Sequence, residues 1–206
     1  GRIGWHIECY VMSKILGHPI DIKGGGLDLV FPHHESTKLI ASALGEELSK
    51  FYMHNAFLTY NKQKMSKSKG ICVSISDGLE SHDRETLRFF LLGLHYRKNL
   101  NYTDDDVVDS ATKLGEIKRV VKSLARSSGA GGGDDSKLFE LTALLENEFY
   151  AGMEDDLDTP RVLDALSDFA SSAKELDVGK SSTAKALEIL GVIGSILGFD
   201  LSTGAM

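Results

Sequence analysis

Cysteine is scarce in this sequence, and long apolar runs are missing from it. The two cysteines among 206 residues, Cys9 and Cys72, lie far apart, and two cysteines exclude a disulfide framework. No apolar run approaches the ~20 residues that a membrane-spanning helix needs. No signal-peptide pattern opens the chain either. We therefore expect a cytoplasmic protein in a reducing setting, with no membrane partner.

The composition is that of an ordinary globular protein, with 42% hydrophobic and 26% charged residues. The length allows one large domain or two modest ones. Charge is divided unevenly: residues 1–133 carry 18 basic and 15 acidic side chains (+3), and residues 134–206 carry 5 and 15 (−10). A polyanion, if one binds, is expected to bind the first part. The chain begins at Gly1 rather than Met and enters patterned sequence directly, which suggests a piece of a longer protein.

The most informative stretch is a lysine-dense loop that contains Lys64-Met65-Ser66-Lys67-Ser68. Two ammonium groups three positions apart on a small-residue loop are suited to hold nucleotide phosphates as negative charge develops on them. A solvated basic loop or a nucleic-acid patch is the alternative. After the loop, Ile71–Ile75 alternates as a strand, and Asp83–Leu94 predicts an apolar-rich helix.

A glycine cluster marks a second candidate site. Ile20–Ile22 predicts a short strand that runs into Gly24-Gly25-Gly26, and a helix is predicted from His33 to Leu44. Strand, glycine turn and helix in this order indicate an α/β fold with its ligand at the carboxyl ends of the strands. A flexible turn is the alternative explanation of the glycines. Asp28 favours a ligand, because a carboxylate just past such a turn can accept both hydroxyls of a ribose.

The remaining elements divide the chain into an α/β part and a helical part. Residues 5–16 have helical spacing, and residues 51–60 resemble a buried strand. No strand signal follows Thr103, and the later elements are four helices and a linker. The expected helices span 104–125, 136–153, 160–177 (Thr159 as cap, Pro160 first) and 183–198, with a flexible Gly/Ser linker at 127–135.

Residues with metal-ligand chemistry cluster in Cys9, His33, His34 and Glu35. A cysteine and one histidine make half of a tetrahedral zinc site. Packing and hydrogen bonding alone are the alternative role for these residues. On a helix that contains His33, Glu35 points to the opposite side, and the same-face position is Thr37, a poor zinc ligand. Any site here is short of protein ligands.

Six motifs in this order resemble the C-terminal portion of the cysteinyl-tRNA synthetases, which are class I aminoacyl-tRNA synthetases. The motifs are Gly4–Cys9 (GWHIEC), Gly24–Asp28 (GGGLD), Phe31–Glu35 (FPHHE), Lys64–Ser68 (KMSKS), His95–Arg97 (HYR) and Asp158–Pro160 (DTP). The resemblance implies an α/β fold, with the C-terminal half of a Rossmann-like catalytic domain at 1–60. A connective segment with the KMSKS loop at 61–102 and a helical bundle domain at 103–206 would follow.

The same resemblance implies ATP-dependent activation of cysteine as cysteinyl-adenylate and its transfer to tRNA(Cys), by a monomer. Zinc would be held by Cys9 and His33 and would bind the substrate's thiolate, while Trp5 would line the amino-acid pocket. ATP, with Mg²⁺, would be held by a set of six residues, and the two lysines of KMSKS would be catalytic. That set is Gly24, Gly25, Gly26, Asp28, Met65 and Lys67, with Lys64 and Lys67 as the catalytic pair.

Three departures from the family accompany the match. Thr37 stands where a glutamate ligand is usual, and Lys23 where a histidine is usual. The HIGH signature and a further zinc cysteine are absent, so the chain alone is expected not to activate cysteine. Thr37 and Lys23 also resemble the mycothiol-pathway ligases, which join cysteine to glucosaminyl-inositol. A noncatalytic module that binds tRNA or a partner is a third hypothesis, disfavoured by the retained Lys64, Lys67, Asp28 and Cys9.

Overall fold

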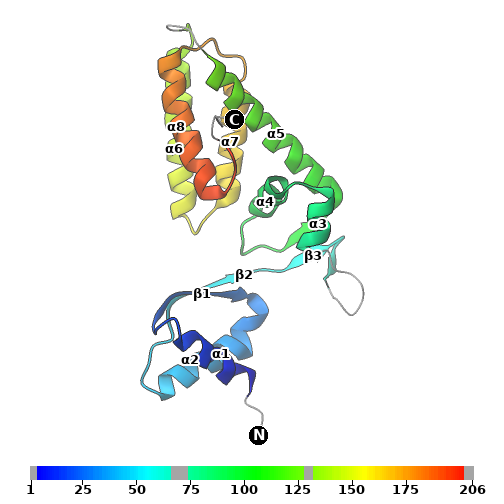
Figure 1. The fold of residues 1–206 in the computed structure, drawn as a ribbon, viewed down its shortest axis with the longest axis vertical. Helices are drawn as coiled ribbons and strands as arrows, with labels where there is room; N and C mark the ends of the chain where they lie inside the picture. Colours follow the sequence, from blue (N-terminus) through cyan, green and yellow to red (C-terminus); the bar gives the residue numbers. More distant parts are fainter. Residues whose placement is uncertain (1–3, 66–73, 128–131, 202–206) are drawn as a thin grey trace. The chain divides into compact units, whose positions relative to one another are not determined.

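The computed structural model describes residues 4–65, 74–127 and 132–201 (Figure 1). The chain divides into two compact units: unit 1 contains residues 1–59 and 96–101, and unit 2 contains residues 60–95 and 102–206. Unit 1 mixes strands and helices, whereas unit 2 is mainly helical. No helix within the described ranges is both long and apolar enough to cross a membrane.

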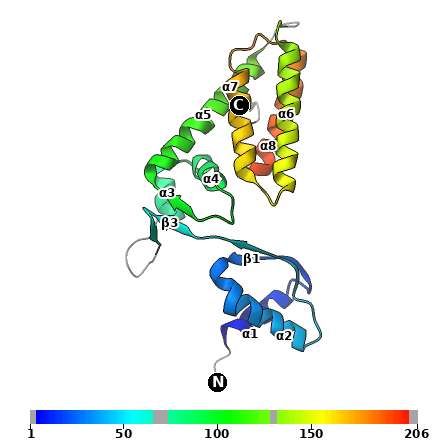
Figure 2. The ribbon, with the colours of Figure 1, turned by 180° about the vertical axis from the view of Figure 1, so that it is seen from behind.

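Unit 1 is a small βαβ arrangement. Strands β1 (Ile20–Gly26) and β2 (Ser49–Asn55) pair in parallel. Parallel strands need a crossover, and here it consists of two short turns and a helix. Helix α1 (Trp5–Lys14) packs against α2 (Glu35–Ala43), and both lie on the same side of the strand pair (Figures 1 and 2). These remaining elements are α1 (Trp5–Lys14), η1 (Leu27–Leu29), η2 (Val30–His34) and α2 (Glu35–Ala43).

The three glycines belong to strand β1 and not to a turn, which corrects the sequence prediction. Backbone pairing with β2 continues to the end of the strand, where Gly24, Gly25 and Gly26 lie opposite Met53, His54 and Asn55. This pairing holds the glycines extended, although glycine alone favours no such conformation. The strand predicted at 51–60 is also corrected: it divides into β2 and β3 (Leu58–Tyr60), and Phe51 is 66% exposed rather than buried.

Unit 1 has a small apolar core and large exposed apolar side chains. Tyr10, Ala41 and Leu48 form the core, with Ile40 packed against it. Ile15 and Leu16, by contrast, are 87% and 80% exposed. Parallel sheets are normally covered by apolar packing on both faces. This unit buries few apolar side chains, so apolar burial contributes little to its stability.

A polar cluster around Glu46 connects α1 to the loop before β2. The Tyr10 hydroxyl donates to Glu46 Oε2 at 2.6 Å, and Lys14 Nζ lies 2.7 Å from Oε1. His18 Nδ1 is 3.0 Å from Oε2. Hydrogen bonds from Lys14, Tyr10 and His18, in that order of size, lower the pKa of Glu46 to about 2. The cluster therefore holds a carboxylate that remains charged far below its ordinary titration range.

A short three-stranded sheet and two helices come after β2 and before residue 103 in the sequence. The sheet has the order β4-β3-β5, with β4 at Gln63–Lys64 and β5 at Leu100–Tyr102, which the sequence did not predict. The strand predicted at 71–75 is wrong where it can be tested: residues 71–73 lie outside the described residues, but Ser74 caps helix α3 (Ile75–Ser81). The helix predicted at 83–94 from its apolar pattern is observed as α4 (Arg84–Leu92), with Asp83 as its N-cap.

The helical part of unit 2 confirms the four predicted helices. They are α5 (Asp104–Arg126), α6 (Asp135–Glu154), α7 (Thr159–Ala173) and α8 (Lys180–Leu197). Helix α6 packs against both α7 and α8 (Figure 2). Fully buried residues such as Leu138, Leu166 and Leu190 belong to their shared core. One cap is corrected: Asp158, not Thr159, accepts the hydrogen bond at the start of α7, because its carboxylate reaches the Arg161 amide.

We predict that Glu46→Gln destabilises unit 1, because the amide keeps the shape of the side chain but loses its charge. The folded-state pKa of Glu46 is about 2, below its ordinary value of 4.5. Its stabilising contribution is therefore complete above pH 4.5 and is lost as pH falls toward 2. Fluorescence of Trp5, the single tryptophan, measures unfolding of this unit. The variant should be less stable at pH 7 and should lose less stability between pH 4.5 and 2.

The control is Glu47→Gln, which changes the neighbouring, exposed carboxylate. It should leave the stability of unit 1 at pH 7, and the loss of stability between pH 4.5 and 2, close to those of the parent chain. Equal effects of the two substitutions would show that the Glu46 contacts do not stabilise the unit.

Candidate functional site

Helix α1 brings two rings onto His33. The ring of Trp5 stacks on that of His33, with centroids 4.2 Å apart and planes at 18°. The Nδ1 atoms of His6 and His33 are 2.7 Å apart. Cys9 follows Trp5 by four residues and His6 by three, so it shares their face of the helix. Trp5, Cys9 and His33, which the sequence assigned to one pocket, thus come from two elements that are in contact.

A second histidine pair joins η2 to β2. His34 Nδ1 lies 2.8 Å from His54 Nε2. The His34 ring also fills the space beside Gly25, where an added Cβ would lie 2.8 Å from the ring's Cε1. Sequence reasoning assigned no role to His6 or His54. His6 stands one helical turn before Cys9 and could have been found by that spacing, whereas His54 meets His34 only through the β1–β2 register.

Burial disfavours the charged form of the His33 and His34 imidazoles. Burial is the main cause of a pKa of about 4 for His34, and the charge of Lys23 adds to the effect. Burial also lowers the pKa of His33, again with smaller contributions from His6 and Lys23. In a neutral pair one ring nitrogen donates and the other accepts. The site therefore offers uncharged nitrogen donors, the form of histidine that binds metals.

The zinc site expected from the resemblance is incomplete. Within residues 4–65, 74–127 and 132–201, no three His, Cys, Asp or Glu residues gather where they could hold a metal ion. Thr37 is fully buried, and its hydroxyl donates to the His34 carbonyl oxygen at 2.9 Å. That hydrogen bond directs the Thr37 hydroxyl to the backbone of the preceding helical turn. Cys9 and His33, the predicted ligands, do not by themselves fit a closed tetrahedral site, which needs four donors.

The glycine end of β1 has one open and two filled positions. An added Cβ on Gly26 would lie 2.6 Å from Oδ1 of Asp28, so that carboxylate folds back against the strand. An added Cβ on Gly24 would meet nothing within 4 Å among the described atoms. The open position is compatible with close approach of a ligand to the backbone. The ATP-binding roles expected for Gly24, Gly25, Gly26 and Asp28 stay predictions.

The KMSKS motif is described only in part. Lys64 ends β4, and Met65 follows it as a half-buried residue. Lys67 lies outside the described residues. The catalytic roles of Lys64 and Lys67 and the ATP contact of Met65 stay predictions.

The chain is similar to known proteins over most of its length. Residues 1–112 match the family described as tRNA synthetases class I (C) catalytic domain. The cysteine–tRNA ligase of Geobacter sulfurreducens is 38% identical over 208 residues, which cover 96% of this chain and 43% of that protein. The chain spans less than half the length of the curated relatives it matches.

Solved structures show the fold. The Agrobacterium radiobacter K84 LeuRS in a ternary complex with tRNA and LeuAMS matches with a TM-score of 0.70 at 15% identity, covering 88% of this chain and 26% of that one. A putative arginyl-tRNA synthetase from Campylobacter jejuni matches with a TM-score of 0.68 at 15% identity, covering 100% and 53%. The predicted fold class, part of a Rossmann-like α/β synthetase domain followed by a helical bundle, is confirmed.

We predict that Gly25→Ala destabilises unit 1 and displaces His34, because the new methyl group would overlap its imidazole. Overpacking of this kind costs about 1–3 kcal/mol. Thermal unfolding measured by Trp5 fluorescence gives the stability, and imidazole NMR signals report the His34–His54 contact. Gly24→Ala, on the same strand but in open space, is the control and should preserve both. Equal destabilisation by the two substitutions would contradict the packing of His34 on Gly25.

Proposed function

Because this chain belongs to the family of class I (C) tRNA synthetase catalytic domains, we propose that it forms part of a cysteine–tRNA ligase. Such an enzyme activates cysteine with ATP and transfers the cysteinyl group to tRNA(Cys). The observation that carries the proposal is the stack of Trp5 on His33, with Cys9 on the same face of α1. The GWHIEC and FPHHE motifs provide these residues, and the contact between the two motifs supports an amino-acid pocket at this place.

In the proposed reaction the cysteine carboxylate attacks the α-phosphate of ATP, and pyrophosphate leaves. A hydroxyl at the 3′ end of the tRNA then attacks the carbonyl of the adenylate, and AMP leaves. Trp5 is 56% exposed although it is stacked on His33, so part of its ring remains free to pack against the amino acid. Asp28 would accept the ribose hydroxyls. Lys64 and Lys67 would stabilise the charge of the departing pyrophosphate, with Mg²⁺ on the phosphates.

The proposal includes a zinc ion, for which the described residues supply two donors. His33 contacts His6 through Nδ1, which leaves Nε2 for a ligand, and such a second contact is the usual way to orient a metal-binding imidazole. The Cys9 thiolate and His33 Nε2 are two donors, and a tetrahedral ion needs two more from outside the described residues. When bound, zinc would favour a thiolate over a hydroxyl and so distinguish cysteine from serine.

An amide-forming ligase is the second candidate. Thr37, buried and bonded to the His34 carbonyl, stands where a carboxylate ligand is usual, and Lys23 replaces a histidine. Both features resemble the mycothiol-pathway ligases, which share the adenylation step but use the amine of glucosaminyl-inositol as acceptor. Formation of cysteinyl-tRNA distinguishes the first candidate from amide formation by the second. A noncatalytic tRNA- or partner-binding module would carry out neither reaction.

We predict that the chain alone does not exchange pyrophosphate into ATP in the presence of cysteine, because it holds only part of the adenylation site. A chimera in which residues 1–206 replace the matching part of the Geobacter sulfurreducens relative should do so. Removing a group that stabilises developing charge costs about 10²–10³ in rate, so Lys67→Ala should slow the exchange to that extent. Lys69→Ala, just beyond the motif, is the control and should keep the rate within a few-fold. A folded chimera that binds ATP but does not activate cysteine would overturn the proposal.

The same chimera tests whether zinc binds and whether Cys9 is one of its ligands. We predict a zinc content near one per molecule, measured by atomic spectroscopy after dialysis, and a much lower content in Cys9→Ser, because zinc binds hydroxyl oxygen weakly. Cys72→Ser is the matched control and should keep the metal. Equal zinc in the two variants would exclude Cys9 as a ligand.

A further inference from the structure

A groove of about 550 Å³ lies between α6 and α7, within unit 2. Its floor is apolar: Leu141, Leu144 and Leu145 follow one another at helical spacing on α6. The buried Phe169 of α7 extends this floor. Leu144 is 57% exposed, although Leu145 beside it is buried. The described part of the bundle therefore leaves part of an apolar strip in contact with water.

The rim of this groove is acidic. One of its carboxylates, Glu148, is paired with Arg161 at 2.7 Å, and another, Asp158, caps α7. Asp164 and Asp168 also line the groove, from positions four residues apart on α7. Across the described residues, neither of these two side chains forms an ion pair or a hydrogen bond. The rim thus keeps two carboxylates without compensation beside the apolar strip.

The stability of α7 does not explain this carboxylate pair. Like charges four residues apart on a helix repel each other and destabilise it. The helix dipole favours carboxylates in the first turn, but α7 begins at Thr159, and Asp164 and Asp168 lie beyond that turn. The free bundle therefore bears a cost for the pair, which a cationic partner would remove.

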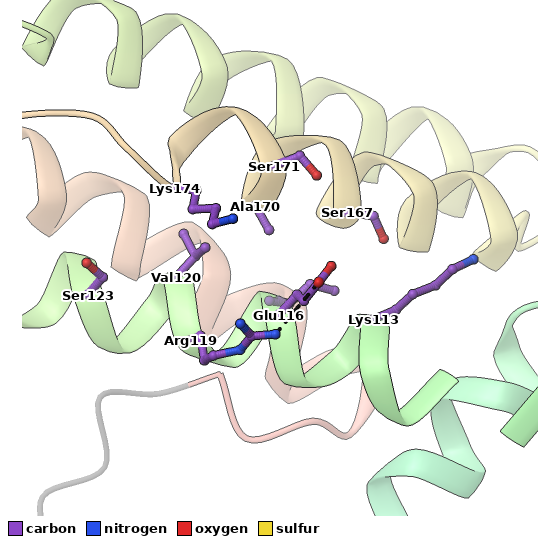
Figure 3. Close-up of a pocket in the computed structure, with 10 residues that line it drawn as sticks. Lys113, Glu116, Arg119, Val120, Ser123, Ser167, Ala170, Ser171 and Lys174 are labelled. Atoms are coloured by element: carbon purple, nitrogen blue, oxygen red, sulfur yellow. Dashed lines mark ion pairs between the residues drawn. The ribbon is translucent and has the colours of Figure 1, made fainter. Parts of the chain in front are cut away.

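A neighbouring groove, between α5 and α7, has the opposite charge (Figure 3). Lys113, Arg119 and Lys174 line it. Glu116, a carboxylate that also lines it, lies 3.7 Å from Arg119. Helix α7 therefore borders a cationic groove and an acidic one. Since carboxylates repel phosphates, the occupant of the acidic groove is not a nucleic acid.

We propose that the groove between α6 and α7 binds a basic amphipathic helix of a partner protein. Apolar side chains on one face of that helix would cover Leu144 and the floor, as in other helix-in-groove complexes. Lysines or arginines beside that face would pair with Asp164 and Asp168. These two carboxylates are separated by an axial rise of about 6 Å, the same as two cations four residues apart on a helix alongside α7. A small polyamine would neutralise the carboxylates but would leave most of the leucine strip exposed.

The test measures binding of a synthetic peptide to the full chain by fluorescence anisotropy. The probe is a labelled peptide of about five helical turns, made of leucine and lysine, with its leucines at helical spacing on one face. A peptide of the same composition in scrambled order is the control probe. It should bind much more weakly, because its leucines form no continuous face.

The groove variant, Asp164→Asn with Asp168→Asn, removes the two unpaired carboxylates. It should weaken binding of the amphipathic peptide about fivefold at low salt and less at high salt, because salt screens exposed charges. Its thermal unfolding should match that of the parent chain or lie slightly higher, which separates lost binding from lost folding. The control variant, Asp109→Asn with Glu154→Gln, makes the same change in net charge at exposed carboxylates outside the groove. It should bind within about twofold of the parent chain.

The apolar contact is tested by Leu144→Ala. This change should weaken binding about fivefold at low and at high salt, because burial of a leucine does not depend on charge screening. Phe139→Ala, at a partly exposed residue of α6 outside the groove, is the control and should leave binding unchanged.

Equal weakening by the groove and control variants would overturn the proposal in favour of a general charge effect. Equal binding of the scrambled peptide, or displacement of the amphipathic peptide by spermidine at equal concentration, would overturn it in favour of a site for any cation. A parent chain that sediments as a dimer, with the groove variant monomeric, would overturn it in favour of a second copy as the occupant. None of these measurements involves activation of cysteine, so the inference goes beyond the proposed function and fails or stands separately from it.

Discussion

The parallel register of β1 with β2 is the constraint on which the candidate site depends. It sets Gly25 opposite His54, and the crossover between the strands brings His34 to both of them. The next residue back, His33, then meets Trp5 and His6 from α1. A shift of this register by one residue would turn His54 to the other face of the strand, and the pair with His34 would be lost.

The same arrangement explains the electrostatics of the site. Histidines packed against one another, against a tryptophan and against glycine backbone lose water, and the charged form of an imidazole suffers most from that loss. Lys23 adds to the effect from within β1. Neutral rings are ready to bind a metal or to share a proton, but the chain adds few further donors, because Thr37 bonds to backbone instead. The site is thus well suited to orient His33 and poorly supplied with metal ligands.

The two units are stabilised in different ways. Unit 2 has a continuous apolar core from four long helices, with several side chains fully buried. Unit 1 has three core residues, a polar cluster at Glu46 and many exposed apolar side chains. Since apolar burial is the main favourable term in folding, unit 1 has the smaller reserve of stability.

The sequence by itself determined what depends on neighbours along the chain. Helical spacing and capping residues located α1 and the four long helices. The order of the motifs led to the family. Such features extend over one or two helical turns, which a linear pattern records directly.

Only the tertiary structure decided which distant residues meet. The His6–His33 and His34–His54 pairs join positions 27 and 20 residues apart. The three glycines at 24–26 belong to a strand because they pair with β2. Ser74 caps a helix, although the alternation at 71–75 had predicted a strand. Lys113 and Lys174 face one groove only because α5 packs against α7. These outcomes follow from register and packing between elements, and no local preference of a residue contains that information.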